Sequence, residues 1–465
     1  AKGSNLDKKE EFVSLIRQVL GEIVHNGVDK KAILAGINYM EFRYREADFG
    51  SYPKGLMYGL DIMGDWLYGD EKPFAQVQQL AVFEQLKKSV DEGYFEQLIR
   101  DCLLENPHGA VLCLVPKKGL AAKREKELAD KLENYRKSLS EKELAEMVKR
   151  TQELEAYQEA EEDPAFLECI PMLKRTDIKR EAAKLTNDPQ QVDGSLFLYH
   201  DVCTNGIGYT DLMFQVQDME IEKIHYLGLL KSVLGLVDTE NYTYGALFNE
   251  INENTGGIMC GVEVFDDAKD PQKFTAMFSV RGKALYPKYE FLFSMIREIL
   301  CTSKLTDTKR LYEIVAQIKS RAQASLVSAG HQTAVLRGSS YGSRMAAFQD
   351  EMAGIGYYHF IENLEKDFEA KKDEIVQNLQ LVMGQILCQE NMSISYTGEK
   401  ESVEMVKTQF VSLKKLMAHM TETDGKQQIS CTKKNEGFKT AGQVQYVAQT
   451  GNFVEKGFAY TGALD

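Results

Sequence analysis

The seven histidines are the first residues to test for metal chemistry, because imidazole is a common zinc ligand. Two ligands on one helical face would be spaced H-x-x-x-H, H-E-x-x-H or H-x-x-E-H. None of these spacings occurs among positions 25, 108, 200, 225, 331, 359 and 419. His200 and Cys203 lie three apart on a predicted strand, so their side chains point to opposite faces. Cys102, His108 and Cys113 could converge in space, but such spacing is common by chance, and we assign no metal site.

A second pattern, at Gly338–Gly342, reads G-S-S-Y-G and formally matches the G-x-S-x-G nucleophile motif of hydrolases. That motif works only between a buried strand and a helix, with an acid and a histidine later in the chain. Ala334–Arg337 is a weak strand at most, His359 lies in a helical pattern, and His419 has no evident acidic partner. A glycine-rich loop leading into a helix at Arg344 is the better interpretation, and a serine hydrolase is the weakest alternative.

Phosphate chemistry has little support. The segments Asn205–Gly208 and Gly354–Gly356 lack the third glycine of a dinucleotide fingerprint, and no G-x-x-x-x-G-K-[ST] sequence occurs. The chain carries 70 Asp and Glu against 56 Lys and Arg, a net charge of −14. Because binding to phosphates requires a basic surplus, this charge excludes nucleic acid as a partner. It is compatible with cationic peptides, although surface acidity more often serves solubility.

The overall composition is that of an ordinary globular protein. The length of 465 residues predicts two to four domains, and the mean hydropathy is −0.34. No apolar run is long enough to span a membrane, so no membrane partner is expected. The eight cysteines are scattered without C-x-x-C. This predicts reduced thiols in a reducing compartment, such as bacterial cytoplasm or an organelle matrix.

The first 116 residues predict mostly helices. One helix begins near Phe12 and ends at Gly27, and Asp29 is placed to cap the next helix. Shorter helical patterns follow at residues 56–67 and 76–90. Ala110–Val115 is a short apolar run closed by Pro116, and it predicts a strand.

Between residues 117 and 188 the composition shifts to Lys, Glu, Leu and Ala. Ser140–Glu143 forms a capping box between two long amphipathic patterns. The apolar stripe is too short and irregular for a sustained coiled coil. We therefore expect two helices that form an inter-domain hairpin.

Beyond residue 191 strands and helices are expected in separate blocks, which predicts an α+β fold. The expected strands are 196–199, 210–216, 259–265, 275–280 and 393–396. The expected helices are 226–237, 289–301, 307–328, 344–352, 358–387 and 403–417. A new strand pattern begins at Gln443–Val447. Because a domain of ordinary size does not fit before Asp465, we expect the last unit to be cut off.

Several sequence blocks occur in a fixed order along nearly the whole chain. They are Tyr44–Leu56 (YREADFGSYPKGL), Asn106–Gly109 (NPHG), Thr204–Tyr209 (TNGIGY), Tyr242–Asn252 (YTYGALFNEIN), Thr255–Ile258 (TGGI), Gly354–Phe360 (GIGYYHF), Tyr446–Ala448 (YVA) and Gly451–Phe453 (GNF). Together they resemble the presequence-protease subfamily of the pitrilysin/insulinase zinc metallopeptidases. The resemblance implies repeated two-layer α/β units, each an antiparallel sheet packed with helices, joined by a long helical hairpin.

The resemblance also implies the domain boundaries. Residues 1–116 would be the C-terminal part of a second metallopeptidase-like unit, 117–190 the hairpin linker, 191–424 an inactive third unit that resembles the catalytic one, and 425–465 the start of a truncated fourth. In this family zinc is bound in the first unit by an inverted H-x-x-E-H motif and a distant Glu. This chain would hold no cofactor, and the zinc would be bound by the absent N-terminal half of the full-length enzyme.

The third unit has an expected counterpart of the zinc helix, which is similar to the segment starting at Tyr226. By this resemblance Tyr226 and Leu230 occupy the metal-ligand positions and Leu229 occupies the position of the general base. None of these side chains can ligate zinc or activate a water. The motif is therefore expected to be degenerate.

The resemblance carries two statements about substrate contacts. The strand at Thr255, Gly256, Gly257 and Ile258 matches in position the substrate-pairing edge strand of the first unit, so contact with the chamber is expected there. The family also uses an Arg and a Tyr spaced R-x-x-x-x-x-Y in its fourth unit, and we expect that pair beyond Asp465. Arg337 and Tyr341 have a different spacing and receive no such role.

These inferences predict the non-catalytic half of a zinc metalloendopeptidase that degrades short unstructured peptides in a closed chamber. The chain would form the chamber wall and would be inactive alone. Its partners would be peptide substrates and the N-terminal catalytic half of the same polypeptide. The alternative is a free-standing, non-catalytic peptide-binding or scaffold subunit that pairs with a separate catalytic chain.

Overall fold

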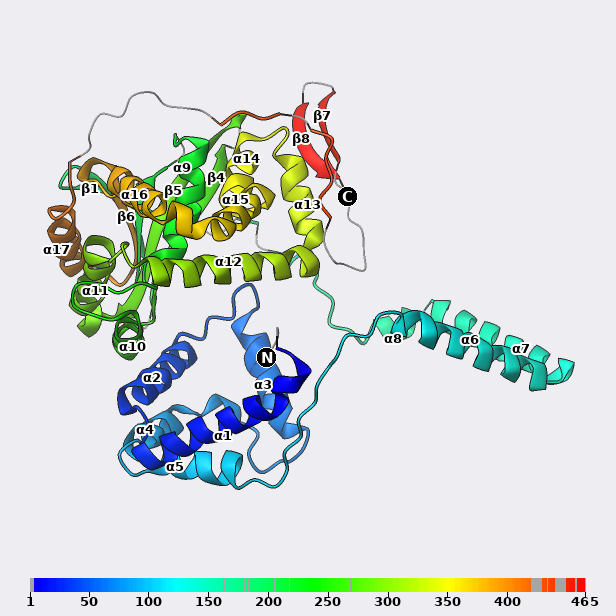
Figure 1. The fold of residues 1–465 in the computed structure, drawn as a ribbon. Helices are drawn as coiled ribbons and strands as arrows, with labels where there is room; N and C mark the ends of the chain where they lie inside the picture. Colours follow the sequence, from blue (N-terminus) through cyan, green and yellow to red (C-terminus); the bar gives the residue numbers. More distant parts are fainter. Residues whose placement is uncertain are drawn as a thin grey trace. The chain divides into compact units, whose positions relative to one another are not determined.

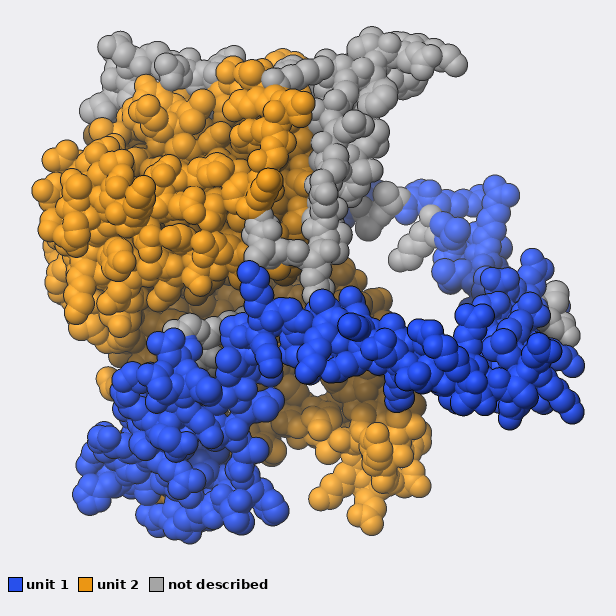
Figure 2. Space-filling view, turned by 45° about the vertical axis from the view of Figure 1, so that its right-hand side comes forward, with its two compact units in different colours: residues 1–27, 96–185 blue, residues 28–95, 186–465 orange. Residues whose placement is uncertain are grey.

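The structure is a computed structural model. It describes residues 4–161, 164–178, 180–181, 184–204, 206–216, 218–267, 270–419, 429–432, 434–439, 449–455 and 458–464. The chain divides into two compact units (Figure 2). Compact unit 1 contains Ala1–Gly27 and Glu96–Leu185, and compact unit 2 contains Val28–Phe95 and Thr186–Asp465.

Compact unit 1 is helical. Helix α1 (Lys9–Asn26) ends at Gly27, whose φ of 90° is in the left-handed region and whose N–H donates to the Ile23 carbonyl over 2.9 Å. Helices α6 (Leu120–Ser138), α7 (Glu141–Glu159) and α8 (Pro164–Leu167) follow. The predicted capping box is present before α7, because Ser140 Oγ accepts from the Glu143 N–H and Glu143 Oε2 accepts from the Ser140 N–H over 2.8 Å.

The predicted strand at Ala110–Val115 is wrong. The segment is irregular, and the side chains of Leu112 and Leu114 are 83% and 89% exposed. A strand requires a neighbour for its backbone N–H and C=O groups. No strand of the described residues pairs with this run, so its apolar composition is not sufficient to make it a strand.

Compact unit 2 begins with helices α2 (Lys30–Glu46), α3 (Lys54–Trp66) and α4 (Leu80–Ser89), and α5 (Tyr94–Ile99) spans its boundary with compact unit 1. The predicted cap of α2 is confirmed, since Asp29 Oδ1 accepts from the Ala32 N–H over 3.1 Å. The helix ends at Ala47, which has a positive φ of 49°.

A six-stranded mixed sheet forms the centre of compact unit 2, in the order β1-β2-β6-β3-β5-β4 (Figure 1). The strands are β1 (Asp188–Val192), β2 (Ser195–Asp201), β3 (Ile207–Gln215), β4 (Ile258–Asp267), β5 (Asp270–Leu285) and β6 (Met392–Gly398). Only β2 and β6 pair in parallel among these strands. The sheet and its helices confirm a mixed α+β fold, and the five strands predicted beyond residue 191 are all present.

The remaining helices of compact unit 2 mostly agree with the predicted pattern. They are α9 (Ile221–Val233), α10 (Tyr244–Asn254), α11 (Tyr289–Thr302), α12 (Thr308–Ser328), α13 (Gly330–Ser339), α14 (Arg344–Ala353), α15 (Ile355–Lys366), α16 (Phe368–Ile386) and α17 (Val403–Lys414). The single helix predicted over 358–387 is instead two helices, α15 and α16, separated at Asp367. The sequence has no Gly or Pro at this break. The break allows Phe368 to lie in the core, where its ring contacts the ring of Tyr312.

A short hairpin completes the chain. Strands β7 (Gln449–Glu455) and β8 (Phe458–Leu464) pair in antiparallel fashion. The strand pattern predicted at Gln443–Val447 lies outside the described residues. The position of the predicted boundary at residues 424 and 425 also lies outside them.

Helices pack on one face of the six-stranded sheet. Along β3, Leu212 and Phe214 point to this face and are fully buried, whereas the alternate residues Asp211 and Met213 face the other side. Helices α11 and α14 contact β5, and α9 contacts β4. The core therefore lies between one sheet face and these helices.

Helix α9 is buried on several sides at once. Leu227 and Leu229 are fully buried and Leu230 is 1% exposed. A Cβ added at Gly228 would lie 2.6 Å from the backbone oxygen of Met352, so only a glycine permits this close approach of α9 and α14.

Replacing Gly228 with Ala should destabilise the protein by about 1–3 kcal/mol, because the new Cβ overpacks this contact. The matched control is Gly384→Ala in α16, where no atom lies within 4 Å of the added Cβ. That variant should gain up to about 1 kcal/mol from the higher helix propensity of Ala. Urea unfolding of both variants measures the difference, and equal effects would contradict the close packing.

Candidate functional site

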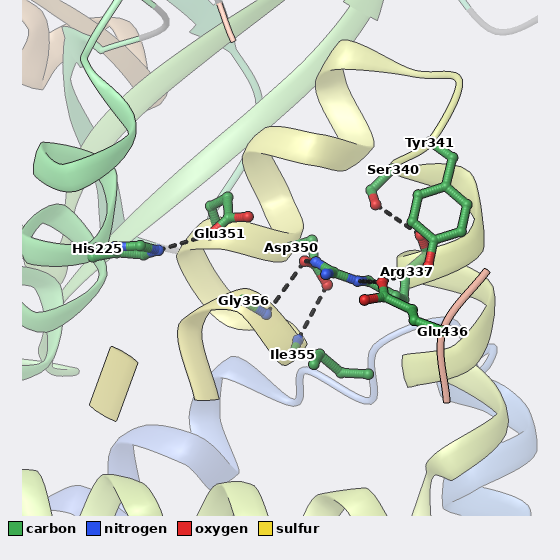
Figure 3. Close-up of polar contacts among 9 residues, drawn as sticks. All are labelled: His225, Arg337, Ser340, Tyr341, Asp350, Glu351, Ile355, Gly356 and Glu436. Atoms are coloured by element: carbon green, nitrogen blue, oxygen red, sulfur yellow. Dashed lines mark hydrogen bonds and ion pairs between the residues drawn. The ribbon is translucent and has the colours of Figure 1, made fainter. Parts of the chain in front are cut away.

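Ser340, the serine of the hydrolase-like pattern, follows a helix rather than a strand. The residues predicted as a weak strand, Ala334–Arg337, belong to α13. Ser340 Oγ is buried and donates to the Arg337 carbonyl over 2.7 Å (Figure 3). The described residues place no histidine in hydrogen-bond contact with this hydroxyl. The arrangement is a helix end and not a nucleophile with its base.

The same region contains a buried carboxylate. Asp350 on α14 is 1% exposed and forms an ion pair with Arg337 of α13. Its two oxygens also accept from the N–H groups of Ile355 and Gly356, over 3.1 and 3.2 Å (Figure 3). Those groups belong to the first turn of α15, where backbone N–H groups have no partner within the helix. Asp350 therefore joins α13, α14 and the start of α15.

Arg337 has a second carboxylate partner, from a segment far along the chain. Its Nε donates to Glu436 Oε1 over 2.6 Å, and the Tyr341 hydroxyl donates to the same oxygen over 2.5 Å (Figure 3). We refer to residues 429–432 and 434–439 as the C-terminal strap. Arg344 Nε also donates to the carbonyl of Ile429 in the strap over 3.1 Å. The strap is thus held on α13 and α14 at two points.

The charges of this network have opposite effects on their neighbours. Burial raises the pKa of Asp350, and the adjacent Arg337 offsets only part of this rise. Burial alone would lower the pKa of Arg337, but Glu436 and Asp350 outweigh it and raise the value. The pKa of Glu436 is lowered, chiefly by the hydrogen bond from Arg337. Arg337 remains charged throughout, and its two carboxylates compensate it.

A neighbouring pair joins α9 to α14. His225 Nε2 lies 2.7 Å from Glu351 Oε2 (Figure 3). The His225 ring also stacks on Phe360, with the ring centroids 4.8 Å apart. The hydrogen bond from His225 lowers the pKa of Glu351. Both side chains are engaged with each other and with packed helices, so the pair connects elements rather than presenting an acid and a base to a ligand.

The predicted degenerate zinc positions lie in the core. Tyr226 is 7% exposed, Leu229 is fully buried and Leu230 is 1% exposed. Over the part of the chain that the structure describes, no three His, Cys, Asp or Glu side chains are grouped so that they could hold a metal. The correspondence of these positions to a zinc motif stays a prediction.

The predicted substrate-contact segment forms the corner between α10 and β4. Thr255 is buried, and its Oγ1 accepts from the Gly257 N–H over 3.1 Å. The Gly256 N–H donates to the Lys283 carbonyl over 2.7 Å. Gly257 has a φ of 112°, which favours glycine. Ile258 then opens β4, and contact of this corner with substrate stays a prediction.

Helix α2 covers part of this corner. A Cβ at Gly256 would collide with the ring of Phe42, which shows how closely α2 approaches. Lys283 of β5 forms an ion pair of 2.6 Å with Glu46, whose side chain is 6% exposed. The two partners are 237 positions apart in the chain. No local sequence signal could have identified this ion pair.

One histidine was assessed wrongly from the sequence. His419, predicted to lack an acidic partner, lies with Nδ1 2.7 Å from Glu390 Oε1. The partner is 29 residues away, on the turn before β6, and only the packing brings the two together. The role of Arg337 as the centre of a charge network was missed for the same reason.

The sequence of this chain is similar to a known protein family. The family described as associated with M16 peptidases of subfamily C matches residues 114–364, more than half of the chain. The chain therefore belongs to this family. Its sequence resemblance to presequence proteases, stated above from short blocks, is confirmed over the central and C-terminal portion.

Individual relatives are consistent with this family membership. Protein HypA of Clostridium perfringens is 36% identical over 466 residues, covering 100% of this chain and 47% of HypA. Presequence protease 1 (chloroplastic/mitochondrial) of Arabidopsis thaliana is 26% identical over 471 residues, covering 99% of this chain and 43% of that protein. The chain thus spans less than half the length of either relative. The structure is weakly similar to a solved peptidase M16 inactive domain from Pseudomonas fluorescens, with a TM-score of 0.35 and 13% sequence identity. The match covers 52% of this chain and 54% of that one.

Two simple features of the described residues complete the description. None of their helices is both long and apolar enough to cross a membrane. All eight cysteines are free thiols, of which Cys388 is buried and Cys260 and Cys431 are partly buried. Burial raises the pKa of Cys260 to about 12, so this thiol is held in its unreactive protonated form.

Arg337→Met should cost about 3 kcal/mol of unfolding free energy, because it leaves the buried Asp350 carboxylate without its counter-charge. Adding Asp350→Asn should recover part of this loss, since the neutral amide is cheaper to bury. The exposed Arg321→Met on α12 is the control and should change stability by less than about 0.5 kcal/mol. Chemical denaturation of the unmodified protein, the two single variants and the double variant measures these differences. A double variant no more stable than Arg337→Met would contradict the pairing.

Glu436→Gln should weaken the strap in a pH-dependent way. Because the folded-state pKa of Glu436 is lowered, its stabilisation is present above the unfolded value near 4.5 and is lost as pH falls through the lower folded value. At pH 7 the loss should be below about 1 kcal/mol, since the carboxylate is 38% exposed and screened. Thermal unfolding at pH 7 and pH 3 should show the difference disappearing. Glu404→Gln is the control and should show no such trend, because the Glu404 side chain is 84% exposed.

Proposed function

We propose that this chain is the non-catalytic half of a zinc metalloendopeptidase that degrades short unstructured peptides in a closed chamber. The observation that carries the proposal is the family membership together with coverage of less than half of HypA and of a presequence protease. The remaining half of such a protein would supply the catalytic zinc site. This chain would form chamber wall and would be inactive alone.

The proposed domain organisation follows the resemblance. Residues 1–116 belong to a second α/β unit, 117–190 to a helical hairpin linker, 191–424 to an inactive third unit and 425–465 to the start of a fourth. Helices α6 and α7 with their capping box support the linker. The six-stranded sheet with its one-sided helices supports the two-layer third unit.

The proposed inactivity of the third unit has a physical basis in α9. If Tyr226 and Leu230 stand at the ligand positions and Leu229 at the position of the base, the helix presents no ligand for zinc. Their burial supports the inactivity, because side chains packed in the core are not available to bind a metal or activate a water. The corner at Thr255–Ile258 is the proposed point of contact with substrate. The eight free thiols support a reducing compartment, cytoplasmic or organellar.

The test is reconstitution with the N-terminal half of the longer polypeptide. The chain alone should contain no stoichiometric zinc by metal analysis and should not cleave a quenched fluorescent peptide. Mixing it with the N-terminal half should produce zinc-dependent cleavage that a chelator abolishes. Zinc or cleavage in the chain alone would overturn the proposal. Stable pairing with a separately encoded catalytic chain, but not with the N-terminal half, would favour the alternative of a free-standing scaffold subunit.

A further inference from the structure

Strand β4 lies at the edge of the six-stranded sheet. It pairs with β5 along one side, from Ile258 opposite Gly282 to Asp266 opposite Phe274. No described strand pairs with its other side. A strand at such an edge presents unpaired N–H and C=O groups along its length, and these groups can pair with an added chain.

This edge has few of the features that usually prevent added strands from pairing, and Glu263 is the single charged residue of Ile258–Phe265. Residues Ile258–Phe265 contain no Lys, Arg or Pro, and the irregularity in the pairing comes only at Asp266 and Asp267. Met259 and Phe265 are 68% and 53% exposed. An exposed apolar edge of this length is suited to a partner that supplies a strand.

A basic side chain reaches this edge from the helix-covered side. Lys231 belongs to the last turn of α9, the helix that contacts β4. It is half-buried, and among the described residues its ammonium donates no hydrogen bond and forms no ion pair within 4 Å. Burial lowers the pKa of its ammonium, and only the field of Glu263 opposes this effect. An ammonium in this position would gain from a carboxylate brought in by a ligand.

An acidic group flanks the same edge on the opposite face. Glu263 alternates with Val262 and Val264, which pack against the core, so it points to the open face of the sheet. There Arg281 contacts both Glu263, over 3.0 Å, and Asp211, over 3.1 Å. Two carboxylates with one guanidinium leave a net charge of one negative, and Asp211 Oδ1 is buried with no hydrogen-bond partner among the described residues. This face would gain from a further cation.

We propose that an extended peptide pairs with the free edge of β4 as a seventh strand, with Glu263 holding a basic side chain on the open face and Lys231 an acidic one on the helix-covered face. This proposal rests on the proposed function, because it takes unstructured peptides as the ligands. It adds a rule of recognition. Successive residues of a strand point to opposite faces, so the basic and acidic residues of a preferred peptide lie an odd number of positions apart.

The experiment measures the affinity of this chain for short, fluorescently labelled, unstructured peptides by anisotropy. One pair of peptides carries a single Lys and a single Glu at adjacent positions, in either order. A second pair of identical composition has them two positions apart. The better of the adjacent peptides should bind about fivefold more tightly than either isomer with the two-residue spacing, as two partly exposed charge pairs allow.

Two variants locate the charges. Glu263→Gln and Lys231→Gln should each remove most of this preference while leaving binding of an uncharged peptide unchanged. Lys273→Gln, near the start of β5 and 72% exposed, is the matched control and should keep the preference. A peptide with alternate N-methylated amides should bind at least tenfold more weakly, because it lacks the donors for strand pairing. Hydrogen exchange at residues 258–267 should slow when the unmodified peptide binds.

Equal affinities for the isomeric peptides, or undiminished binding of the N-methylated peptide, would overturn the proposal. Concentration-dependent dimerisation with β4 protected in the absence of peptide would assign the edge to a second copy and overturn it as well. Protection of β4 by the N-terminal half alone, with peptides excluded, would also overturn it. The proposed function has a separate readout, which is peptide cleavage by the reconstituted halves. If cleavage occurs and is unchanged by the Glu263 and Lys231 variants, only this inference is contradicted.

Discussion

Burial of α9 against the sheet is the constraint on which the arrangement of compact unit 2 depends. The helix contacts β4, α14 and α16, and Gly228 permits the close approach to Met352. With Leu227, Leu229 and Leu230 out of water, the helix contributes several kcal/mol to folding but offers no polar side chain from those positions. None of these three side chains is a zinc ligand, as the proposed inactivity of this unit requires.

The charge network around Arg337 shows how a costly group can organise its surroundings. Burying Asp350 is unfavourable unless its oxygens are satisfied, and here an ion pair and two backbone N–H groups satisfy them. The same guanidinium then binds Glu436 of the strap. One arginine therefore couples the packing of α13–α15 to the position of the strap.

The open face of the sheet has a different character from the covered one. On it lie Met213, Arg281 and Glu263, whereas the covered face holds Leu212, Phe278 and Val280, all fully buried. Helix α2 covers one end of the open face through Phe42 and Glu46, whereas Met259 and Phe265 of β4 are 68% and 53% exposed. A sheet covered by helices on one face and only in part on the other is compatible with the proposed chamber wall.

Local chemistry in the sequence was sufficient for many elements. Asp29 and Ser140 cap helices because their side chains accept backbone N–H groups a few residues away, and Gly27 ends α1 because it tolerates a positive φ. The alternation of β3 and β5 and the apolar run of α9 also follow from spacing alone. Contacts of this kind depend only on residues that are close together in the sequence. Family membership was recognised the same way, from short blocks in a fixed order.

Other features were decided only by tertiary structure. Ala110–Val115 has a strand composition but no strand, because pairing needs a partner that sequence spacing cannot supply. The break at Asp367, the helix at Gly330–Ser339 and the pairing of Glu46 with Lys283 depend on packing between distant segments. The charge network of Arg337 and the edge flanked by Lys231 and Glu263 arise likewise from groups brought together in space. The energies of such contacts depend on distance and burial, and neither quantity exists until the chain has folded.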